Sequence, residues 1–257
     1  MKKAGERTGW ILLLILLWVG LIRAGGFSPL IFPSPQDVLK ALHEGFTQGN
    51  LGWQILISMG LVLSGLIAAS VAAFLFFLIS ASSRTGQSLV ETLTIIFHPL
   101  AGIALLPVVI LWFGTGALSI IFIILHSALW PMVTNLTTGY QSLPETYRIV
   151  GRNYELSKWR MFTQIILPGS LPYILAGLKI SWSRSWRALI SAEMIFGAVF
   201  KTGGVGWYIF SRRVFMDTPG MFAGITVVII IGILMEDLFF GVLEKNTVSK
   251  WGMTLES

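Results

Sequence analysis

The sequence contains no cysteine and few charged residues. Without cysteine the chain forms no disulfide and offers no thiolate for catalysis or metal binding. Charged residues make up only 12% of its 257 residues, about half the share of roughly 25% that is usual in soluble domains. Long stretches of the chain therefore carry no charge at all, which argues against an ordinary soluble domain.

Motifs of common catalytic sites are also missing. No Gly-x4-Gly-Lys-Ser/Thr stretch provides a phosphate-binding loop, and His43-Glu44 lacks the second histidine of a metalloprotease helix. No Gly-x-Ser-x-Gly turn positions a nucleophilic serine. His98 and His126 lie in apolar stretches with few carboxylates nearby, which favours packed or hydrogen-bonded histidines over metal ligands. We therefore predict no catalytic residue, no metal site and no cofactor in this chain, and we interpret it as not an enzyme.

Apolar residues are abundant instead. They make up 54% of the chain, including ten tryptophans and 17 phenylalanines, and the mean hydropathy is +0.78. Aromatic residues in such numbers suit membrane interfaces and interiors. We predict an all-α polytopic membrane protein, a single domain over 1–257 with six transmembrane helices. The predicted spans are 10–22, 54–80, 92–112, 118–136, 172–197 and 221–243.

Two segments need a separate interpretation. The first span follows a basic start and could be a cleaved signal peptide, but no clear small-x-small site precedes a polar region, so we expect a retained helix. The third span contains Pro99 and Pro107, which predict a kink that serves either packing or a cavity. Between the first two spans, a short amphipathic helix is expected over 34–46.

The distribution of basic residues predicts the topology. The net charge of +6 could attract nucleic acid or anionic lipid. With the N-terminus inside, however, the inside segments hold ten lysines and arginines and the outside segments five, while three more lie in the fifth span. Because cytoplasmic loops are enriched in these residues, we expect both termini and the loop after the fourth span in the cytoplasm. Membrane lipid is then the expected partner, and nucleic acid is not.

That loop is the longest polar stretch between two apolar ones. Ser142-Leu143-Pro144-Glu145 reads as a capping box, which predicts a helix of about ten residues from Glu145. Ser157 is expected to cap a second short helix, and Pro168 and Pro172 are expected to break and restart the chain. Residue properties alone leave two interpretations open, an ordered surface loop or a docking element for a soluble partner.

The loop resembles the cytoplasmic EAA loop in permease subunits of ABC-type importers. The family pattern ends in Ile-x-Leu-Pro, matched by Ile165-Ile166-Leu167-Pro168, and the resemblance is closest to the branch that imports sulfonates, taurine and nitrate. Two positions depart from the pattern. Ile149-Val150-Gly151 stands where the family often has Glu-Ala-Ala, and Glu155 stands where it has a loop glycine. Other matching stretches are Phe32-Pro33-Ser34-Pro35, Leu111-Trp112-Phe113-Gly114, Leu171-Pro172, Gly177-Leu178-Lys179, Ala192-Glu193 and Gly204-Val205-Gly206.

The resemblance implies a type I ABC importer permease in a bacterial cell membrane. Its implied partners are a second permease as a homodimer, two ABC ATPase subunits that hold ATP and Mg, and an external solute-binding protein. Residues 139–170 would form the coupling loop to the ATPase. The candidate coupling residues are Glu145, Tyr147, Val150, Gly151, Tyr154, Glu155, Leu156, Trp159 and Pro168.

The fifth span is unusually polar and holds the candidate translocation-path residues Lys179, Arg184, Arg187 and Glu193. Lys179 and Glu193 match positions of the family, while Arg184 and Arg187 look like additions. Three residues apart on a helix, the two arginines share a face. They either pair with Glu91, Glu236 or Asp237, or they line the path and favour an anion such as a sulfonate, carboxylate or nitrate.

Two functions outside this family were weighed as alternatives. An ATP-independent secondary transporter or channel would fit the apolar composition, but we detect no inverted repeat of the kind such transporters show. A membrane enzyme would need a catalytic constellation that the sequence does not contain.

Overall fold

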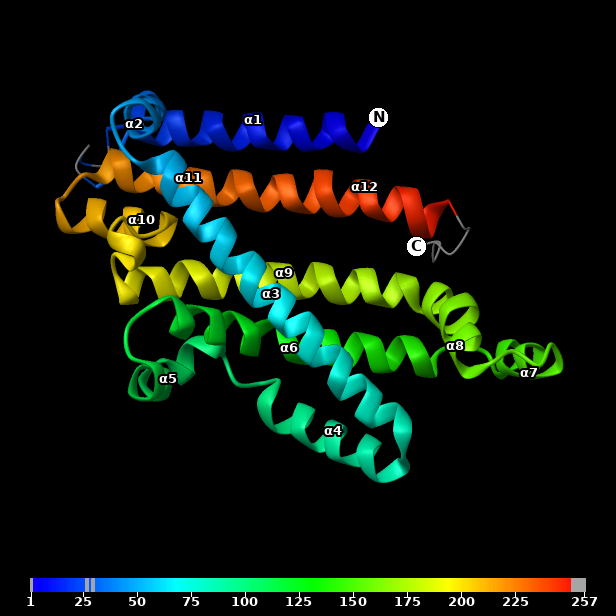
Figure 1. Ribbon diagram of the computed structural model, residues 1–257. Coiled ribbons are helices and arrows are strands. Elements are labelled where there is room, and N and C mark those ends of the chain that lie inside the picture. The colour runs from blue at the N-terminus through cyan, green and yellow to red at the C-terminus, as the bar shows by residue number, and fades with distance from the viewer. Residues whose placement is uncertain (1, 26–27, 29–30, 251–257) are drawn as a thin grey trace. The chain divides into compact units, whose positions relative to one another are not determined.

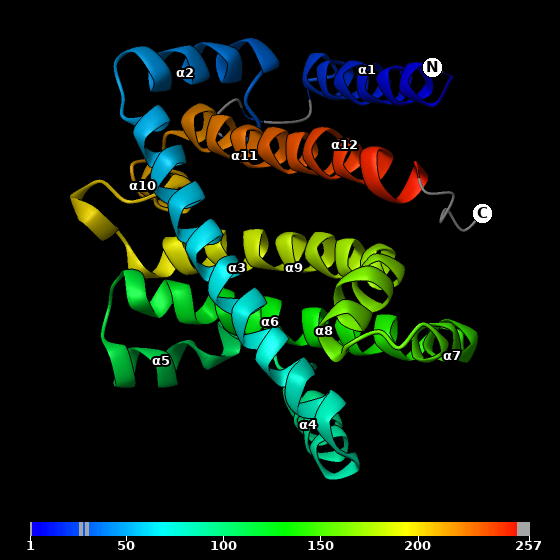
Figure 2. The same ribbon diagram turned by 45° about the vertical axis from the view of Figure 1, so that its right-hand side comes forward.

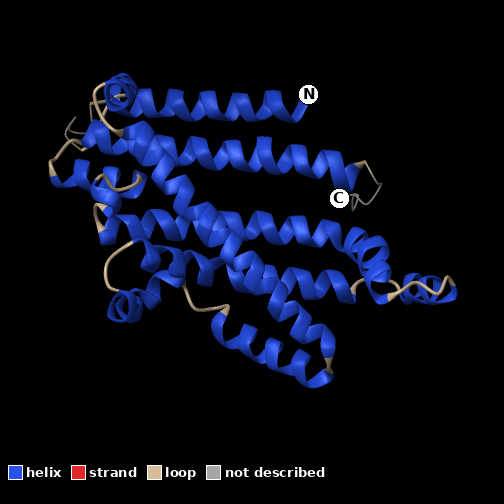
Figure 3. Ribbon diagram, viewed as in Figure 1, coloured by secondary structure: helices blue, strands red, loops and turns tan. Residues whose placement is uncertain are grey.

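The computed structural model describes residues 2–25, 28 and 31–250. Within this part of the chain every regular element is helical and none is a strand (Figure 3), so the all-α prediction is confirmed. The chain divides into two compact units. The first unit consists of Met1–Ser58 and Glu193–Ile230, and the second of Met59–Ala192 and Ile231–Ser257.

Among the residues that the structure describes, four helical stretches are long and apolar enough to cross a membrane, or five if the bent pair Arg84–Phe97 and Gly102–Phe113 is one span (Figure 1). They are α3 (Leu51–Ser82), α6 (Ala117–Gln141), Lys158–Phe196, which ends in α9 (Leu167–Phe196), and Thr218–Val248, which begins with α11 (Thr218–Ile233) and contains α12 (Gly241–Glu244). These stretches correspond to the second, fourth, fifth and sixth predicted spans. The N-terminal α1 (Lys2–Arg23) is helical over 22 residues, and the part of it whose side chains are described without a gap, Leu12–Arg23, is apolar but shorter than a bilayer-crossing helix. The count of six spans therefore stays a prediction.

The third predicted span is not one continuous helix. It is divided into α4 (Arg84–Phe97) and a second piece made of a 3₁₀ turn (Gly102–Leu105) and α5 (Leu106–Phe113), and the two pieces are bent by 83° (Figure 2). The distortion that Pro99 and Pro107 predicted for the span over 92–112 is confirmed, but it is a break between two helical pieces and not a kink within one helix. Pro99 lies in the break, where its missing N–H and its restriction of the preceding residue end α4. Pro107 lies in the first turn of α5, where proline is tolerated.

The first unit contains the predicted amphipathic helix as α2 (Pro35–Thr47). Ser34 caps it: its hydroxyl accepts from the Asp37 N–H at 3.2 Å, and the Asp37 carboxylate accepts from the Ser34 N–H at 3.3 Å. The Trp18 ring of α1 donates from Nε1 to the Pro33 carbonyl at 3.2 Å and lies 6.1 Å from the Phe222 ring of α11. These contacts hold α1 beside α11.

The second unit has its core around α6, the most deeply buried span. Trp130 stacks on Phe97 of α4 with ring centroids 5.4 Å apart. Aromatic pairs of this kind add about 0.5–1.5 kcal/mol beyond area burial. The stack fixes the end of α4 against α6 and so positions the bent connection that follows. The buried members of this cluster are Ala73, Val90, Leu129, Trp130, Met132 and Val133.

The polar loop folds into α7 (Glu145–Asn153) and α8 (Lys158–Met161). α7 has nine residues, close to the predicted ten. Ser157 caps α8 as predicted and accepts from the Arg160 N–H at 3.3 Å. The predicted capping box at Ser142 is wrong, because Pro144 occupies the N-cap position and the Ser142 hydroxyl donates to the Gly139 carbonyl of α6 at 3.1 Å.

The predicted break at Pro168 and Pro172 is also wrong. The chain stays helical from α8 through a π-helical turn, Phe162–Ile166, into α9, which contains Pro172. A π-helical turn is wider than an α-helical one and often marks a place where a helix absorbs a distortion. It comes directly before Pro168 and gives the proline ring room without ending the helix. The coupling loop is therefore joined to the fifth span by continuous helix.

Candidate functional site

A cavity of about 500 Å³ lies within the second unit. Three elements form it: the bent connection between α4 and α5, the middle of α6, and the second half of α9. Its polar lining includes His98, His126, Arg184, Arg187 and Ser191, and Trp130 lies among its apolar walls. The prediction that Arg184 and Arg187 share a face is confirmed, since both side chains line this one cavity.

Neither arginine has an acidic partner among the described residues. Arg187 donates from Nε to the Ser183 carbonyl of its own helix at 3.2 Å, and Arg184 interacts electrostatically with His98 across the cavity. Arg184 is half-buried and Arg187 is exposed in the single chain. Two positive charges thus face one cavity with no carboxylate to compensate them.

The carboxylates that could have paired with these arginines are engaged elsewhere or lie out of reach. Glu91 accepts from the Gln87 amide at 2.8 Å. Glu236 pairs with Lys179 at 3.2 Å, so Lys179 is placed in an ion pair and not in the arginine cavity. Asp237 does not come within salt-bridge distance of either arginine.

Two further side chains of the cavity wall carry polar atoms without hydrogen-bond partners. Both ring nitrogens of His126 and Nε1 of Trp130 are buried and unpaired. The His126 ring packs edge-on between Phe97 and Trp130, with centroids 6.4 and 6.2 Å away. An unsatisfied buried polar group costs about 1–3 kcal/mol. These buried atoms are therefore a source of instability within the cavity wall that no contact between described residues relieves.

Glu193 belongs to a different cluster, in the first unit. Its side chain is 1% exposed and accepts from the Ser58 hydroxyl at 2.7 Å and from the Gly206 N–H at 2.8 Å. Ser58 in turn accepts from the Val205 N–H at 2.9 Å. Both N–H groups lie in the first turn of α10 (Val205–Val214), where backbone donors lack helical partners. A Cβ at Gly204 would collide with Glu193, so the close approach requires glycine.

This cluster fastens α10 to the start of α3 and the end of α9. Glu193 is thus hydrogen-bonded within the first unit, and a role for it on the solute path stays a prediction.

The coupling loop presents an apolar surface. Tyr147, Val150, Tyr154 and Trp159 are exposed, Tyr154 by 77% and Trp159 by 71%. Gly151 is buried instead, packed against Met161 and Ile165. A Cβ at this position would lie 2.5 Å from Cε of Met161 and 2.9 Å from Cδ1 of Ile165, so there is no space for a side chain. Gly151 therefore lets α7 approach the helix that leads into α9, and Leu156 is half-buried between the two helices.

Two other candidate coupling residues lie at the edges of this surface. Glu145 is exposed and lies 4.0 Å from Arg152 on α7, a contact that contributes little between exposed side chains. Pro168 is half-buried in the first turn of α9.

Glu155 ends α7 in a left-handed backbone conformation, with φ of 50°. The Leu156 N–H donates to the Gly151 carbonyl at 3.0 Å and the Glu155 N–H to the Arg152 carbonyl at 2.9 Å. This pair of bonds is a Schellman motif, whose left-handed position is usually glycine. The turn that a glycine would favour is therefore kept with a glutamate, whose side chain makes no hydrogen bond or ion pair to a described residue.

Comparison with known proteins places this arrangement in a family. Residues 62–248 match the family described as binding-protein-dependent transport system inner membrane component. The chain belongs to this family. The matched region contains the arginine cavity, the coupling loop and α10, so the permease resemblance seen in the sequence is confirmed.

Relatives at about 30% identity extend over most of the permease. It is 31% identical to the nitrate import permease protein NrtB of Synechocystis sp., over 93% of this chain and 87% of that protein. It is 28% identical to the taurine transport system permease protein TauC of Escherichia coli, over 89% and 83%. It is 29% identical to the putative aliphatic sulfonates transport permease protein SsuC of Bacillus subtilis, over 99% and 93%. The permease is therefore a transport subunit of an ABC importer and a multi-pass membrane protein.

The sequence did not identify every residue of the permease's cavity. His98, His126 and Trp130 come from α4 and α6, and only their packing against α9 brings them to the arginines. No pattern in the sequence predicted the contacts of Glu193 with Ser58 and Gly206, which depend on the packing of α3 and α10 against the end of α9.

Proposed function

We propose that this permease imports a small anion, a sulfonate, taurine or nitrate among the candidates, through a path that passes the arginine cavity. One observation carries this proposal: Arg184 and Arg187 face a single cavity of about 500 Å³ and have no acidic partner among the described residues. The names of relatives that act on nitrate, taurine and aliphatic sulfonates agree with an anionic solute.

The charge balance of the cavity supports an anion over other solutes. A charged side chain near the centre of a membrane span costs roughly 2.5–3.5 kcal/mol on insertion scales, and it normally faces protein or water. An anionic solute would compensate both arginines and accept charge-assisted hydrogen bonds from their guanidinium groups. A cation would be repelled by them.

The remaining assembly follows from the family and from the exposed loop. Two permeases would form a homodimer, two ATPase subunits would bind the coupling loops in the cytoplasm, and an external binding protein would deliver the solute. ATP and Mg would be held by the ATPase subunits. ATP binding would close the ATPase pair and move α7 and α8. Continuous helix from α8 to α9 would carry that motion to the arginines. Nucleotide can drive the change only through different affinity for the two states.

Uptake assays test the proposal directly. The permease is reconstituted with its ATPase and binding protein, and ATP-driven uptake of taurine, an alkyl sulfonate and nitrate is measured for the wild type and for Arg187→Gln. Loss of a hydrogen bond to a charged group costs about 1.5–3 kcal/mol. We expect uptake of the transported anion to fall at least tenfold, while complex assembly and basal ATP hydrolysis persist.

The matched control is Arg213→Gln, an exposed arginine of α10 outside the cavity. It makes the same chemical change and is expected to leave uptake at the wild-type level. Unchanged uptake in Arg187→Gln, or an equal loss in both variants, would overturn the anion path.

A further inference from the structure

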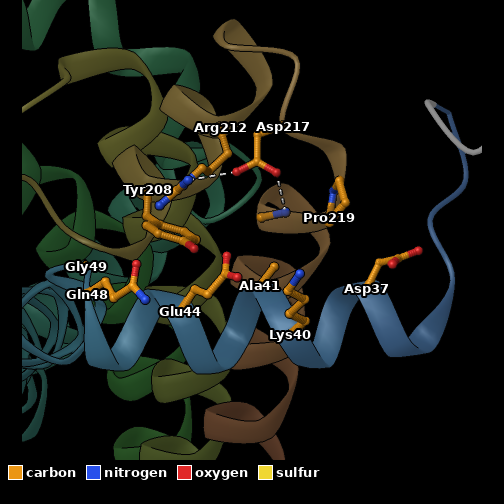
Figure 4. Close-up of a pocket in the computed structure, with 11 residues that line it drawn as sticks. Asp37, Lys40, Ala41, Glu44, Gln48, Gly49, Tyr208, Arg212, Asp217 and Pro219 are labelled. Atoms are coloured by element: carbon orange, nitrogen blue, oxygen red, sulfur yellow. Dashed lines mark hydrogen bonds and ion pairs between the residues drawn. The ribbon is translucent and has the colours of Figure 1, made fainter.

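A second polar cavity, of about 410 Å³, lies within the first unit. One wall is α2, with Lys40, Glu44 and Gln48, and the other is formed by α10 and the start of α11 (Figure 4). It shares no lining residue with the arginine cavity. Nothing in the transport mechanism proposed above uses it.

The α10–α11 wall carries charges that neutralise each other. Arg212 Nη1 lies 2.7 Å from Asp217 Oδ2, and Asp217 Oδ1 accepts from the Gly220 N–H at 2.9 Å. The Arg212 guanidinium also lies over the Tyr208 ring, 4.9 Å from its centroid. A Cβ at Gly220 would collide with Asp217, so glycine allows this tight corner. The ion pair, the hydrogen bond and the cation–π contact thus hold the α10–α11 wall in place.

The α2 wall carries one free charge of each sign. Lys40 and Glu44 are exposed, and neither forms a salt bridge with a described residue. They are four residues apart, which places them on one face, about 6 Å apart along the helix axis at 1.5 Å per residue. In Figure 4, Glu44 points from α2 toward Tyr208, and Lys40 lies one turn along the same cavity edge. Asp37, by contrast, is engaged in the cap of α2.

A hydroxyl between the two walls is unsatisfied. The Tyr208 hydroxyl is buried and has no hydrogen-bond partner among the described residues. It lies close to α2 at Gly45, where a Cβ would lie 3.0 Å from the oxygen. Burial raises the pKa of Tyr208, although the nearby Arg212 opposes the shift. The phenol therefore stays protonated and able to donate.

We infer that this cavity is a binding site for a small zwitterion, with an ammonium group for Glu44 and an oxyanion for Lys40. A simple anion would compensate Lys40 but meet the Glu44 carboxylate, and a simple cation would compensate Glu44 but meet the Lys40 ammonium. A molecule with both charges a few ångströms apart compensates both free side chains at once. Its oxyanion can also accept from the Tyr208 hydroxyl. Both a free aminosulfonate or amino acid and a phosphoethanolamine lipid headgroup carry this pair of charges.

The test uses the purified full-length permease in nanodiscs of phosphatidylglycerol. Taurine, which carries both charges, is titrated calorimetrically beside ethanesulfonate and ethylamine, which each lack one. Titrations are run on the wild type and on Arg187→Gln, so that heat arising in the arginine cavity is recognised.

We expect taurine to bind at least tenfold more tightly than either comparator, and Lys40→Met or Glu44→Gln to weaken taurine binding at least tenfold. Glu244→Gln, at an exposed glutamate outside both cavities, is the matched control and is expected to change nothing.

A second arm distinguishes the source of the zwitterion. The permease is transferred to discs that contain phosphatidylethanolamine, and retained lipid is measured by native mass spectrometry. Retention that Glu44→Gln abolishes, together with competition against taurine, assigns the site to a lipid headgroup. Taurine binding without lipid retention assigns it to a free zwitterion. If taurine binds equally to wild type, Lys40→Met and Glu44→Gln and no lipid is retained, or if ethanesulfonate matches taurine, the site does not exist. Because anion uptake through the arginine cavity is a separate measurement, its failure would leave this result standing.

Discussion

Glu155 occupies a backbone position that usually belongs to glycine. Its φ of 50° and the two hydrogen bonds of the Schellman motif place Glu155 at the left-handed position of the turn. A residue with a Cβ pays roughly 1–2 kcal/mol in a left-handed conformation. The Glu155 carboxylate has no partner among the described residues that would offset this strain. The strain at Glu155 is therefore not offset by any described residue of the permease.

The first prediction concerns this residue. Glu155→Gly is expected to raise the stability of the permease by up to about 1 kcal/mol, because relief of the strain exceeds the extra entropy that glycine gives the unfolded chain. Thermal unfolding in detergent measures the change. Glu155→Ala is the matched control, since it removes the carboxylate but keeps the Cβ, and it is expected to give no gain.

Activity separates a strained turn from a functional carboxylate. If the Glu155 carboxylate has no function, both Glu155→Gly and Glu155→Ala are expected to keep ATP-driven uptake. A large loss of uptake in both would show that the carboxylate contacts the ATPase, and stability that falls in Glu155→Gly would contradict the strain.

At the scale of elements, α7 presents an exposed apolar stripe that we predict to bind the ATPase. Tyr147, Val150 and Tyr154 are three and four residues apart, so they lie on one face, and all three are exposed. Arg152 lies on the opposite face beside Glu145. Gly151 faces Met161 within the loop, which makes it a poor probe of docking because any side chain there would disrupt packing first.

The second prediction is that Val150→Asp disrupts ATPase binding. Burying an unpaired carboxylate in an apolar interface costs several kcal/mol, so the variant is expected to lose co-purification of the ATPase at least tenfold. Helix content of the purified permease, measured by circular dichroism, is expected to stay unchanged. Arg152→Gln changes the net charge by the same amount on the other face and is the control. Wild-type recovery of the ATPase with Val150→Asp would contradict docking through this stripe.

The bent third span shows what element prediction did not decide. Pro99 and Pro107 predicted a distortion of the third span, but these two residues are compatible with either a kinked helix or a complete break. The outcome is an 83° bend because the Phe97–Trp130 stack holds the end of α4 while α5 packs along another direction. The direction in which α5 packs cannot be predicted from the periodicity of apolar residues along the sequence.

At the scale of the whole molecule, orientation in the membrane remains a prediction from basic-residue counts. The absence of cysteine makes it directly testable, since a single introduced thiol is the only reactive site. Leu39, exposed on α2, is expected outside, and Asn153, at the end of α7, is expected in the cytoplasm.

The third prediction follows from this topology. In intact cells, a membrane-impermeant maleimide is expected to label Leu39→Cys at once and Asn153→Cys only after permeabilisation. Wild-type permease, which has no thiol, sets the background. The reverse pattern would place the coupling loop outside and contradict both the topology and the proposed contact with a cytoplasmic ATPase.

Much of this permease could be read from its sequence, because the deciding features are local. Apolar run length predicted four of the spans, since a bilayer-crossing helix needs about 20 apolar residues. Ser157 and the amphipathic pattern over 34–46 predicted helices whose caps involve neighbouring residues only. The shared face of Arg184 and Arg187 followed from helical periodicity alone, and the ordered set of family stretches identified the permease.

Tertiary structure decided what depends on contacts between distant residues. Glu193 is hydrogen-bonded by Ser58 of α3 and by the Gly206 N–H of α10, contacts that no sequence pattern predicted. His98, His126 and Trp130 reach the arginine cavity only because α4 and α6 pack against α9. Periodicity assigns a side chain to a face of its own helix. Only the packing of other helices against that face decides whether the side chain is paired, buried or left facing a cavity.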